Sequence, residues 1–376
     1  MITRIKVKNF KSLVDFEISG LSKFNCFIGL NGAGKTTLLQ FLDFLRVVLT
    51  GRVKEWFEQH RWKPGSILSL GSTKRSVEFE VDIEDSNVLV TWEGRFNTME
   101  LRCVYEQISV WSNGEKKSTL LFDDNKLKVH GNDYPLPPGF RQFGSIFALL
   151  NESPRYLLEL SDIRIFGVLS PMAIATASQV RTGMKSRDVQ ANGSGLMGFV
   201  SQLSAEKQKQ LFEKLKEFYP PLQSCKIEKQ PFGLRNLLFN EIGNAYYEAS
   251  HLSYGTLRLL VILSQLYSDG RCIVFDEIEN GINQELMGRM IDLLQDFDEK
   301  QVMVTTHSSL VLNYLSDEKA IESVIFLFKD ARGGTKAVKF FEIEEMSSKL
   351  KTLGPGEVMA DTDLEKLSKK LSVLDG

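Results

Sequence analysis

The chain has 376 residues, more than the roughly 100 to 200 of a typical domain, so we expect a second lobe or a large insertion. Hydrophobic residues make up 43% of the sequence and charged residues 25%, and no apolar run is long enough to span a membrane. These values predict a globular, cytoplasmic protein, and the net charge of −2 excludes a surface that binds polyanions over its whole extent.

The N-terminal part of the chain carries the most specific pattern. Apolar residues alternate over 2–7 and again over 16–18, which predicts a pair of antiparallel strands. Residues 24–28 are an apolar run typical of a buried strand, and residues 37–49 have apolar positions at helical spacing. Between that strand and that helix, the pattern G-x-x-x-x-G-K-[ST] is matched at every fixed position by Gly29-Leu30-Asn31-Gly32-Ala33-Gly34-Lys35-Thr36.

Strand, glycine loop and helix together predict a nucleotide-binding site. The backbone N–H groups of such a loop and the positive end of the helix face the phosphate oxygens. We expect Lys35 to reach the β and γ phosphates and the Thr36 hydroxyl to ligate Mg²⁺, which makes ATP and Mg²⁺ the expected cofactors. The alternative, a glycine-rich turn with a surface lysine, leaves the flanking elements unexplained. The expected nucleotide contacts are Asn31, Gly32, Ala33, Gly34, Lys35, Thr36 and Thr37.

The middle of the chain changes its periodicity twice. Strict alternation with turn signals over 76–129 predicts an antiparallel β meander. Helical spacing follows over 142–160 and again over 196–218. The polar, glycine-containing segment 183–195 is expected to be a mobile loop between lobes.

These patterns predict a nucleotide-binding core in two parts with two lobes between them. Short apolar segments at 225–227 and 237–239 indicate strands on the way back to the core. The expected division is 1–70 for the first part of the core, 71–138 for the antiparallel β lobe, 139–222 for the helical lobe, 223–350 for the second part of the core and 351–376 for a C-terminal tail.

Two carboxylates follow a short apolar strand at 271–275. An ATPase needs such a pair beside its phosphate loop, so we expect Asp276 to hold Mg²⁺ through its water shell and Glu277 to act as the general base. The next apolar strand, 301–305, is followed by His307, which we expect to contact the γ phosphate. Alone, these residues would be an ordinary acidic turn and a packing histidine, but the glycine loop favours catalytic roles.

A second anion site is predicted near residue 253. Ser253 opens an apolar helix with Gly255 close by, and a helix N-terminus of this kind binds anions. One chain does not need two phosphate cradles for one nucleotide. We therefore expect a homodimer in which each copy presents Ser253 and Gly255 to the ATP held by the other copy's Lys35 loop. The motif is Leu252-Ser253-Tyr254-Gly255-Thr256-Leu257-Arg258.

The glycine loop, the segment that begins at Leu252, the acidic pair and the histidine, in this order, resemble the ATP-binding-cassette (ABC) class of ATPases. More narrowly they are similar to the RecF, OLD and SMC-like branch, often labelled predicted AAA-type ATPases. The resemblance implies an α/β P-loop core with a mixed sheet and flanking helices, an antiparallel β lobe and an inserted helical lobe. It also implies ATP hydrolysis, with roles in anti-phage defence or DNA repair. The opening sequence is similar too: Val7-Lys8-Asn9-Phe10-Lys11-Ser12-Leu13.

The sequence departs from this branch in several places. Relatives commonly carry proline and histidine where this chain has Ile278 and Asn283, so the rate of hydrolysis is in question. The Q-loop glutamine has three candidates, Gln142, Gln179 and Gln190. No Toprim-type nuclease cluster follows the histidine, and no long heptad coiled coil is present in the sequence.

The chain is therefore expected to pass its output to another molecule. We expect a homodimer or higher oligomer that acts on DNA or on a separate effector protein, a nuclease or toxin, and not on a membrane. An alternative from another class is a nucleotide-gated scaffold that hydrolyses ATP slowly and holds a toxin or effector inactive. A transporter's nucleotide-binding subunit fits poorly, because the sequence shows no feature for coupling to a membrane.

Overall fold

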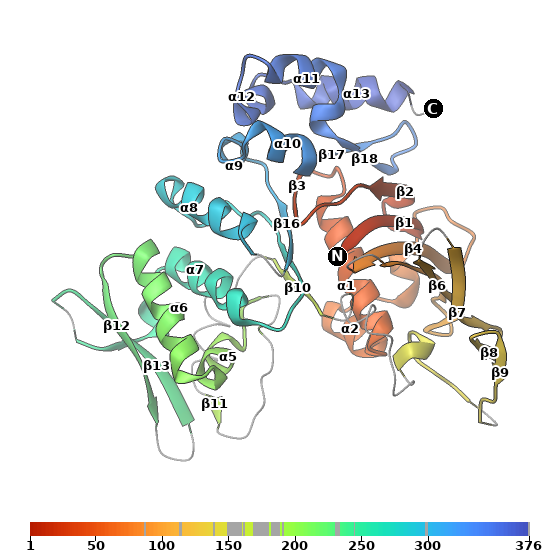
Figure 1. Cartoon of the computed structure of the whole chain (residues 1–376), viewed down its shortest axis with the longest axis horizontal. Coiled ribbons are helices and arrows are strands. Elements are labelled where there is room, and N and C mark those ends of the chain that lie inside the picture. Colours follow the sequence, from red (N-terminus) through yellow and green to blue (C-terminus); the bar gives the residue numbers. More distant parts are fainter. Residues whose placement is uncertain are drawn as a thin grey trace.

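The computed structural model describes residues 1–85, 88–112, 115–137, 140–148, 160, 162–167, 180–181, 189, 192–229, 234–243, 245–297 and 300–374. Within these residues the chain forms three β-sheets with helices around them (Figure 1). None of the helices in this part of the chain is long and apolar enough to cross a membrane.

A six-stranded mixed sheet lies at the centre of the molecule (Figure 1). Its first five strands are parallel, and the last is antiparallel to its neighbour. Three of the parallel strands are buried at every position, as expected for strands covered on both faces. In spatial order the strands are β10 (Ile163–Phe166), β15 (Cys272–Phe275), β16 (Gln301–Thr305), β3 (Phe24–Ile28), β17 (Val324–Lys329) and β18 (Thr335–Lys339).

The central sheet separates two hydrophobic cores, and alternate residues of β3 enter different ones. Phe27 packs in the core that contains α1 (Lys35–Leu49), whereas Cys26 and Ile28 pack in the core on the opposite face. Packing thus fixes both faces of the strand that precedes the glycine loop. The helices of the second core are α7 (Tyr254–Ser264), α8 (Gln284–Gln295), α9 (Ser309–Leu312) and α10 (Asp317–Ser323).

The predicted β meander is confirmed as part of an eight-stranded antiparallel sheet in the order β2-β1-β4-β5-β6-β7-β8-β9. The two N-terminal strands belong to this sheet, and α1 and α2 (Val53–His60) pack against its inner face. The lobe is therefore joined to the core by packing as well as by the chain. Its strands are β1 (Ile2–Phe10), β2 (Leu13–Ser19), β4 (Ser76–Asp85), β5 (Val88–Asn97), β6 (Arg102–Ser112), β7 (Glu115–Asp123), β8 (Lys126–Val129) and β9 (Asn132–Tyr134).

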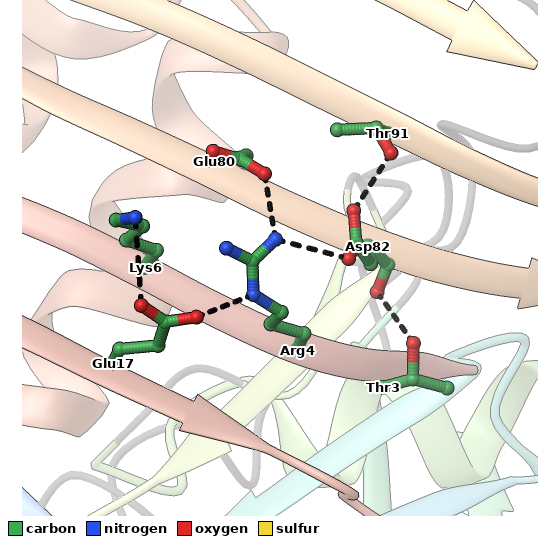
Figure 2. A network of polar contacts seen from close by, with 7 residues as sticks. All are labelled: Thr3, Arg4, Lys6, Glu17, Glu80, Asp82 and Thr91. Carbon is green, nitrogen blue, oxygen red and sulfur yellow. Dashed lines mark hydrogen bonds and ion pairs between the residues drawn. The ribbon is translucent and has the colours of Figure 1, made fainter. Parts of the chain in front are cut away.

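Figure 2 shows charged side chains that connect β1 to the strands on both sides of it. Arg4 Nε lies 2.7 Å from a carboxylate oxygen of Glu17 on β2, and Arg4 Nη1 lies 2.6 Å from one of Glu80 on β4. The same Nη1 lies 3.2 Å from Asp82. Although burial favours the neutral form, the three carboxylates raise the pKa of Arg4. Cross-strand pairs of opposite charge stabilise this register of the sheet.

A third sheet lies across the central sheet from the eight-stranded one (Figure 1). Its strands are β11 (Val180–Arg181), β13 (Leu234–Glu241) and β12 (Leu222–Lys229), with β14 (Tyr247–Glu248) also paired to β13. Helical structure over 196–218 is confirmed as α5 (Leu196–Gln202) and α6 (Ala205–Phe218). Two helices form because Ser204 caps α6, its Oγ accepting a hydrogen bond from the Lys207 N–H.

The helix predicted over 142–160 is wrong for residues 142–148, where a single 3₁₀ turn forms at Ile146–Ala148. The reason is the buried carboxylate of Glu106, which accepts hydrogen bonds from Ser145 Oγ at 2.6 Å and from the Ile146 N–H at 2.7 Å. Gly144, with a φ of 73°, turns the chain immediately before them. Residues 149–159 and most of the loop predicted at 183–195 lie outside the described residues.

The C-terminal segment packs against the central sheet. Val358 and Leu367 are buried there in the second core. The helices are α11 (Glu344–Leu350), α12 (Pro355–Ala360) and α13 (Leu364–Leu374). Further 3₁₀ turns lie at Pro64–Ile67, Ala249–His251, Gln265–Tyr267 and Phe340–Glu342.

Candidate nucleotide-binding site

The carboxyl ends of β15, β16 and β3 meet at one edge of the central sheet, because these neighbouring strands are parallel. Ligands of open α/β sheets bind at this edge. A cleft of about 200 Å³ lies there, between the glycine loop and the ends of the other two strands. It is lined by Asn31, Gly32, Gly34, Lys35, Thr36, Thr37, Asp276, Glu277 and His307.

The glycine loop is held in shape by close packing at two of its glycines. Gly29 has a φ of 149°, and a Cβ there would lie 2.4 Å from the carbonyl oxygen of Leu327. Gly34 has a φ of 114°, and a Cβ there would lie 2.3 Å from Thr335 Oγ1. Helix α1 starts directly after Gly34 with no side chain capping it, so its first N–H groups remain available for an anion.

Lys35 is buried and folded back over its own loop. Its Nζ donates hydrogen bonds to the carbonyl oxygens of Gly29 and Leu30, at 2.7 and 3.1 Å. Burial lowers the pKa of Lys35 to about 8, and the nearby carboxylates of Asp276 and Glu277 limit that fall. The ammonium thus lies in the cleft, hydrogen-bonded to two neutral carbonyl oxygens.

The Thr36 hydroxyl and the Asp276 carboxylate face each other across the cleft. Thr36 Oγ1 is 3.5 Å from Asp276 Oδ2, while Asp276 Oδ1 accepts a hydrogen bond of 2.5 Å from the Thr305 hydroxyl. Hydroxyl and carboxylate oxygens are the ligands that Mg²⁺ prefers, so this pair fits the metal expected with a nucleotide. Thr305 leaves Oδ2, the oxygen nearer Thr36, free for that role.

Glu277 has an unusual backbone conformation, with a φ of 47°. Its N–H donates to Thr305 Oγ1 at 2.8 Å, and its carbonyl oxygen accepts from Arg258 Nη2 at 2.6 Å. The same Nη2 also donates to the carbonyl oxygen of Asp276, at 3.0 Å. A non-glycine residue in this left-handed region persists only where its surroundings hold it, and such strain is common at active sites.

His307 is exposed and lines the cleft, two residues after the end of β16 at Thr305. Its backbone N–H donates to Glu279 Oε1 at 2.8 Å. The other oxygen of that carboxylate, Oε2, is buried and has no hydrogen-bond partner among the described residues. Glu279 therefore connects the turn after β15 to the turn after β16, the two turns that carry the acidic pair and the histidine.

The segment that begins at Leu252 packs beside the cleft without lining it. Ser253 caps α7, its Oγ accepting a hydrogen bond of 3.1 Å from the Thr256 N–H. A Cβ on Gly255 would lie 2.5 Å from the carbonyl oxygen of Gly281, so α7 lies directly against the turn that follows the acidic pair. Ser253 is exposed and Gly255 is half-buried, and neither residue lines the cleft that the Lys35 loop of the same chain forms.

Two family models match the chain. Residues 1–137 match a model described as "AAA ATPase domain", and residues 175–313 match one described as "AAA domain, putative AbiEii toxin, Type IV TA system". The first model covers the glycine loop, and the second covers the acidic pair and His307. Each half of the cleft therefore lies within an ATPase domain model.

Short stretches of the chain are similar to curated RecF proteins. A 46-residue segment is 46% identical to "DNA replication and repair protein RecF" of Coxiella burnetii (strain Dugway 5J108-111), covering 12% of this chain and 13% of that protein. RecF of Bacteroides thetaiotaomicron is 47% identical over 45 residues, or 12% of each chain. These matches span a small part of the relatives' length.

Likeness in fold extends much further along the chain. The structure titled "Crystal structure of the SmcHead bound to the C-winged helix domain of ScpA" covers 90% of this chain and 96% of its own, with a TM-score of 0.52 and 16% identity. Over residues 1–137 and 175–313 the chain is thus similar to AAA-type ATPase domains, and its fold is similar to that of an SMC head. ATP is the nucleotide that these domain models imply for the cleft.

Ala33 is the one residue of the predicted loop set that does not line the cleft. It is buried, and its carbonyl oxygen accepts a hydrogen bond from Thr335. Of the three Q-loop candidates, Gln142 is buried in the β lobe, where it donates to the Cys103 carbonyl oxygen. Gln179 and Gln190 lie outside the described residues.

Sequence reasoning gave no positioning role to four residues that hold the lining residues in place, although one of them, Arg258, belongs to the motif at 252–258. They act through hydrogen bonds between segments far apart in the chain, for which one sequence contains no pattern. The exception is Glu279, whose position two residues after the acidic pair could have suggested a role. The four are Arg258, Glu279, Thr305 and Thr335.

Proposed function

We propose that this chain is an ABC-class ATPase of the RecF- and SMC-like branch that binds Mg-ATP, dimerises around it, and couples its hydrolysis to DNA sensing or to a partner effector such as a nuclease. The carrying observation is the convergence of Thr36, Asp276 and Glu277 on one cleft, together with Lys35 and His307. Asp276, Glu277 and His307 follow the ends of two adjacent parallel strands, and Lys35 and Thr36 begin the helix after the loop that follows the third. The cellular role we propose is anti-phage defence or DNA repair in the cytoplasm.

In this proposal the loop N–H groups and Lys35 bind the phosphates, and Glu277 accepts the proton of the attacking water. Mg²⁺ held by Thr36 and Asp276 would neutralise charge on the phosphate oxygens. The exposed His307 contacts the γ phosphate. Thr305 and Arg258 hold the acidic turn, so that Glu277 keeps its φ of 47°.

Dimerisation is supported by the place of the Ser253 segment. Ser253 and Gly255 do not line the cleft of their own chain. The N-terminus of α7 nevertheless offers N–H groups for an anion. A second copy facing the first would bring these groups to the γ phosphate, so ATP would act as the bridge between the two chains.

The proposed output rests on the proteins that this chain is similar to. One matching model names an AbiEii toxin and a type IV TA system, and the curated relatives are named for DNA replication and repair. The described residues contain no cluster of three or more histidine, cysteine, aspartate or glutamate side chains that could hold a catalytic metal of a nuclease. We propose a separate nuclease or toxin as the effector, in keeping with the toxin system that the second model names.

The proposal is tested with Glu277→Gln, which keeps the size of the side chain and removes the base. Light scattering after size exclusion should give the 42.6 kDa monomer without nucleotide and a particle of about twice that mass with ATP and Mg²⁺. Turnover of the variant should fall by roughly 10² to 10⁴ relative to the unchanged protein. Equal turnover in both proteins, or a mass indifferent to ATP, would contradict the proposal.

A second candidate is a slowly hydrolysing, nucleotide-gated scaffold that holds a toxin or effector inactive. It is favoured by the residues beside the acidic pair: Ile278 is buried, and Asn283 caps α8, its Oδ1 accepting from the Glu285 N–H at 3.3 Å. Neither side chain is available to assist hydrolysis. Background turnover in both the unchanged protein and Glu277→Gln, with ATP still bound, would support the scaffold over the ATPase cycle.

A further inference from the structure

Thr335, at the start of β18, lies directly under the glycine loop although 302 positions separate it from Ala33 in the chain. The residue is fully buried. Its backbone N–H donates to the carbonyl oxygen of Ser12, in the turn between β1 and β2, at 2.7 Å. One buried residue thus joins the eight-stranded sheet, the β17–β18 hairpin and the loop that lines the cleft.

The Thr335 hydroxyl uses its whole hydrogen-bonding capacity. A hydroxyl has one proton to donate and can accept two hydrogen bonds. The proton goes to the Ala33 carbonyl oxygen at 2.9 Å, while Lys329 Nζ donates to Oγ1 at 2.9 Å. Ser12 Oγ is also 2.9 Å from Oγ1 and must be the donor there, because the Thr335 proton is already engaged.

The bond to Ala33 determines which way the next peptide N–H points. In a trans peptide the carbonyl and the following N–H lie on opposite sides, and the described chain has no cis peptide bond. With the Ala33 carbonyl oxygen directed at Thr335, the Gly34 N–H is directed to the other side. Gly34 lines the cleft, so that side is the one where phosphate oxygens are expected.

The conformation of Gly34 makes this restraint necessary. With a φ of 114° and no side chain, Gly34 can rotate at little cost, since glycine has access to most of its dihedral space. Thr335 closes the back of the loop so tightly that a Cβ on Gly34 would lie 2.7 Å from its Cγ2. The methyl group limits the space, and the hydroxyl fixes the peptide orientation.

We infer that the Thr335 hydroxyl is a positioning group for phosphate binding: it aims the Gly34 N–H at the phosphates of ATP and of ADP. The inference rests on the proposed nucleotide binding, which it deepens. It also assigns Ser12 and Lys329 a supporting role, because their hydrogen bonds to Oγ1 leave Ala33 as the acceptor for the Thr335 proton.

The test compares Thr335→Val with Thr335→Ser. Valine keeps the shape and loses the oxygen, whereas serine keeps the oxygen and loses the methyl group. By fluorescence titration, the Kd values for ATP and for ADP should both rise about tenfold in Thr335→Val. This is the effect of losing one hydrogen bond to a charged group, here the bond from the Gly34 N–H to a phosphate oxygen. Thr335→Ser should stay within about threefold of the unchanged protein.

A merely structural role predicts a different result. It would lower the Tm of the nucleotide-free protein and leave the Tm increase caused by a fixed ADP concentration unchanged, whereas our inference requires that increase to shrink. Equal Kd values in Thr335→Val and the unchanged protein, or equal losses in both variants, would overturn the inference. If the unchanged protein bound no nucleotide, the proposed function would fail first.

Thr335→Val leaves the Lys329 ammonium without this acceptor and could fail to fold. Ser12→Ala is then the variant to measure, because it removes one donor to Oγ1 and leaves the others in place. With one of the two donors gone, the Thr335 hydroxyl is less restrained and can rotate away from the Ala33 carbonyl oxygen for part of the time, so we expect a rise of about threefold in both Kd values. An unchanged Kd for ADP in Ser12→Ala would count against the inference.

Discussion

A carboxylate is bound differently in the β lobe and in the nucleotide cleft. Glu106 on β6 is fully buried, and both its oxygens accept hydrogen bonds, from Ser145 Oγ and from the Ile146 N–H. Asp276 is partly exposed, and its closest hydrogen bond, from Thr305, uses one oxygen. The protein saturates the first carboxylate and leaves an oxygen of the second directed at the cleft.

The difference distinguishes a structural contact from a ligand site in this fold. At the structural contact between Glu106 and residues 145–146, the protein satisfies every acceptor of the carboxylate, which stabilises the packing of this segment on β6. In the site, neighbouring groups fix the orientation of the carboxylate but leave capacity for a ligand. Changes at Glu106 should therefore appear in stability, and changes around Asp276 should appear in nucleotide chemistry.

Among the changes that test this comparison, the largest effect is expected at Glu106. Burial raises the pKa of this carboxyl from 4.5 to about 7, against the opposing effect of its hydrogen bonds. Between these values the folded protein keeps a proton that the unfolded chain has released, so stability falls as pH rises through 7. The loss is about 3 kcal/mol between pH 4.5 and 8. Urea denaturation across this range should show it.

Glu106→Gln is the matched control, because an amide does not titrate. The pH-dependent loss of stability should largely disappear in this variant, while the remaining carboxylates give the same background in both proteins. ATP turnover at a fixed pH should change little, since Glu106 lies in the β lobe and not at the cleft. If the free energy of unfolding changed with pH in the same way in both proteins, Glu106 would not retain a proton in the folded state.

A smaller effect is expected at Thr305, on the cleft side of the comparison. Thr305→Val removes the hydroxyl that donates to Asp276 and accepts from the Glu277 N–H, at 2.5 and 2.8 Å. We expect turnover to fall roughly 30-fold, about 2 kcal/mol, because both carboxylates lose their orientation. Thr305→Ser should retain most of the activity. Steady-state kinetics would reject the role if valine and serine behaved alike.

The smallest effect concerns the charge of Lys35. Since burial lowers its pKa to about 8, the free protein loses this positive charge as pH rises through 8. Affinity for ATP should therefore fall roughly fourfold between pH 7 and 8.5. Isothermal titration calorimetry in buffers of different ionisation heat should also detect proton uptake on binding at pH 8.5. Constant affinity over this range would mean that the ammonium stays protonated.

The α/β P-loop fold was implied by the resemblance to ABC-class ATPases, and it is the fold that the structure has. Most of the residues that line the cleft could be named from local spacing: a loop between a strand and a helix, and polar residues directly after buried strands. Parallel strands then bring such ends together without further information. Lys35 and Glu277 could be placed in this way, because the motif defines the position of each within a strand–turn unit.

The residues that position the lining of the cleft could not be predicted from the sequence, and the reason is physical. Thr335 and Thr305 act through hydrogen bonds to segments 302 and 29 positions away, and a single threonine gives no signal of its partner. The wrong helix at 142–148 has the same origin, because Glu106, from another strand, takes the N–H of Ile146. Tertiary contacts of this kind override local propensity.

The hydrogen bonds from Lys35 to Gly29 and Leu30 also bear on the reversibility of the proposed nucleotide binding. The protein's own carbonyl oxygens accept from the buried ammonium, so this cation has partners without a phosphate. Binding of a nucleotide would exchange these partners for phosphate oxygens, and release would restore them. The proposed cycle would therefore return to its starting state without any unfolding of the glycine loop.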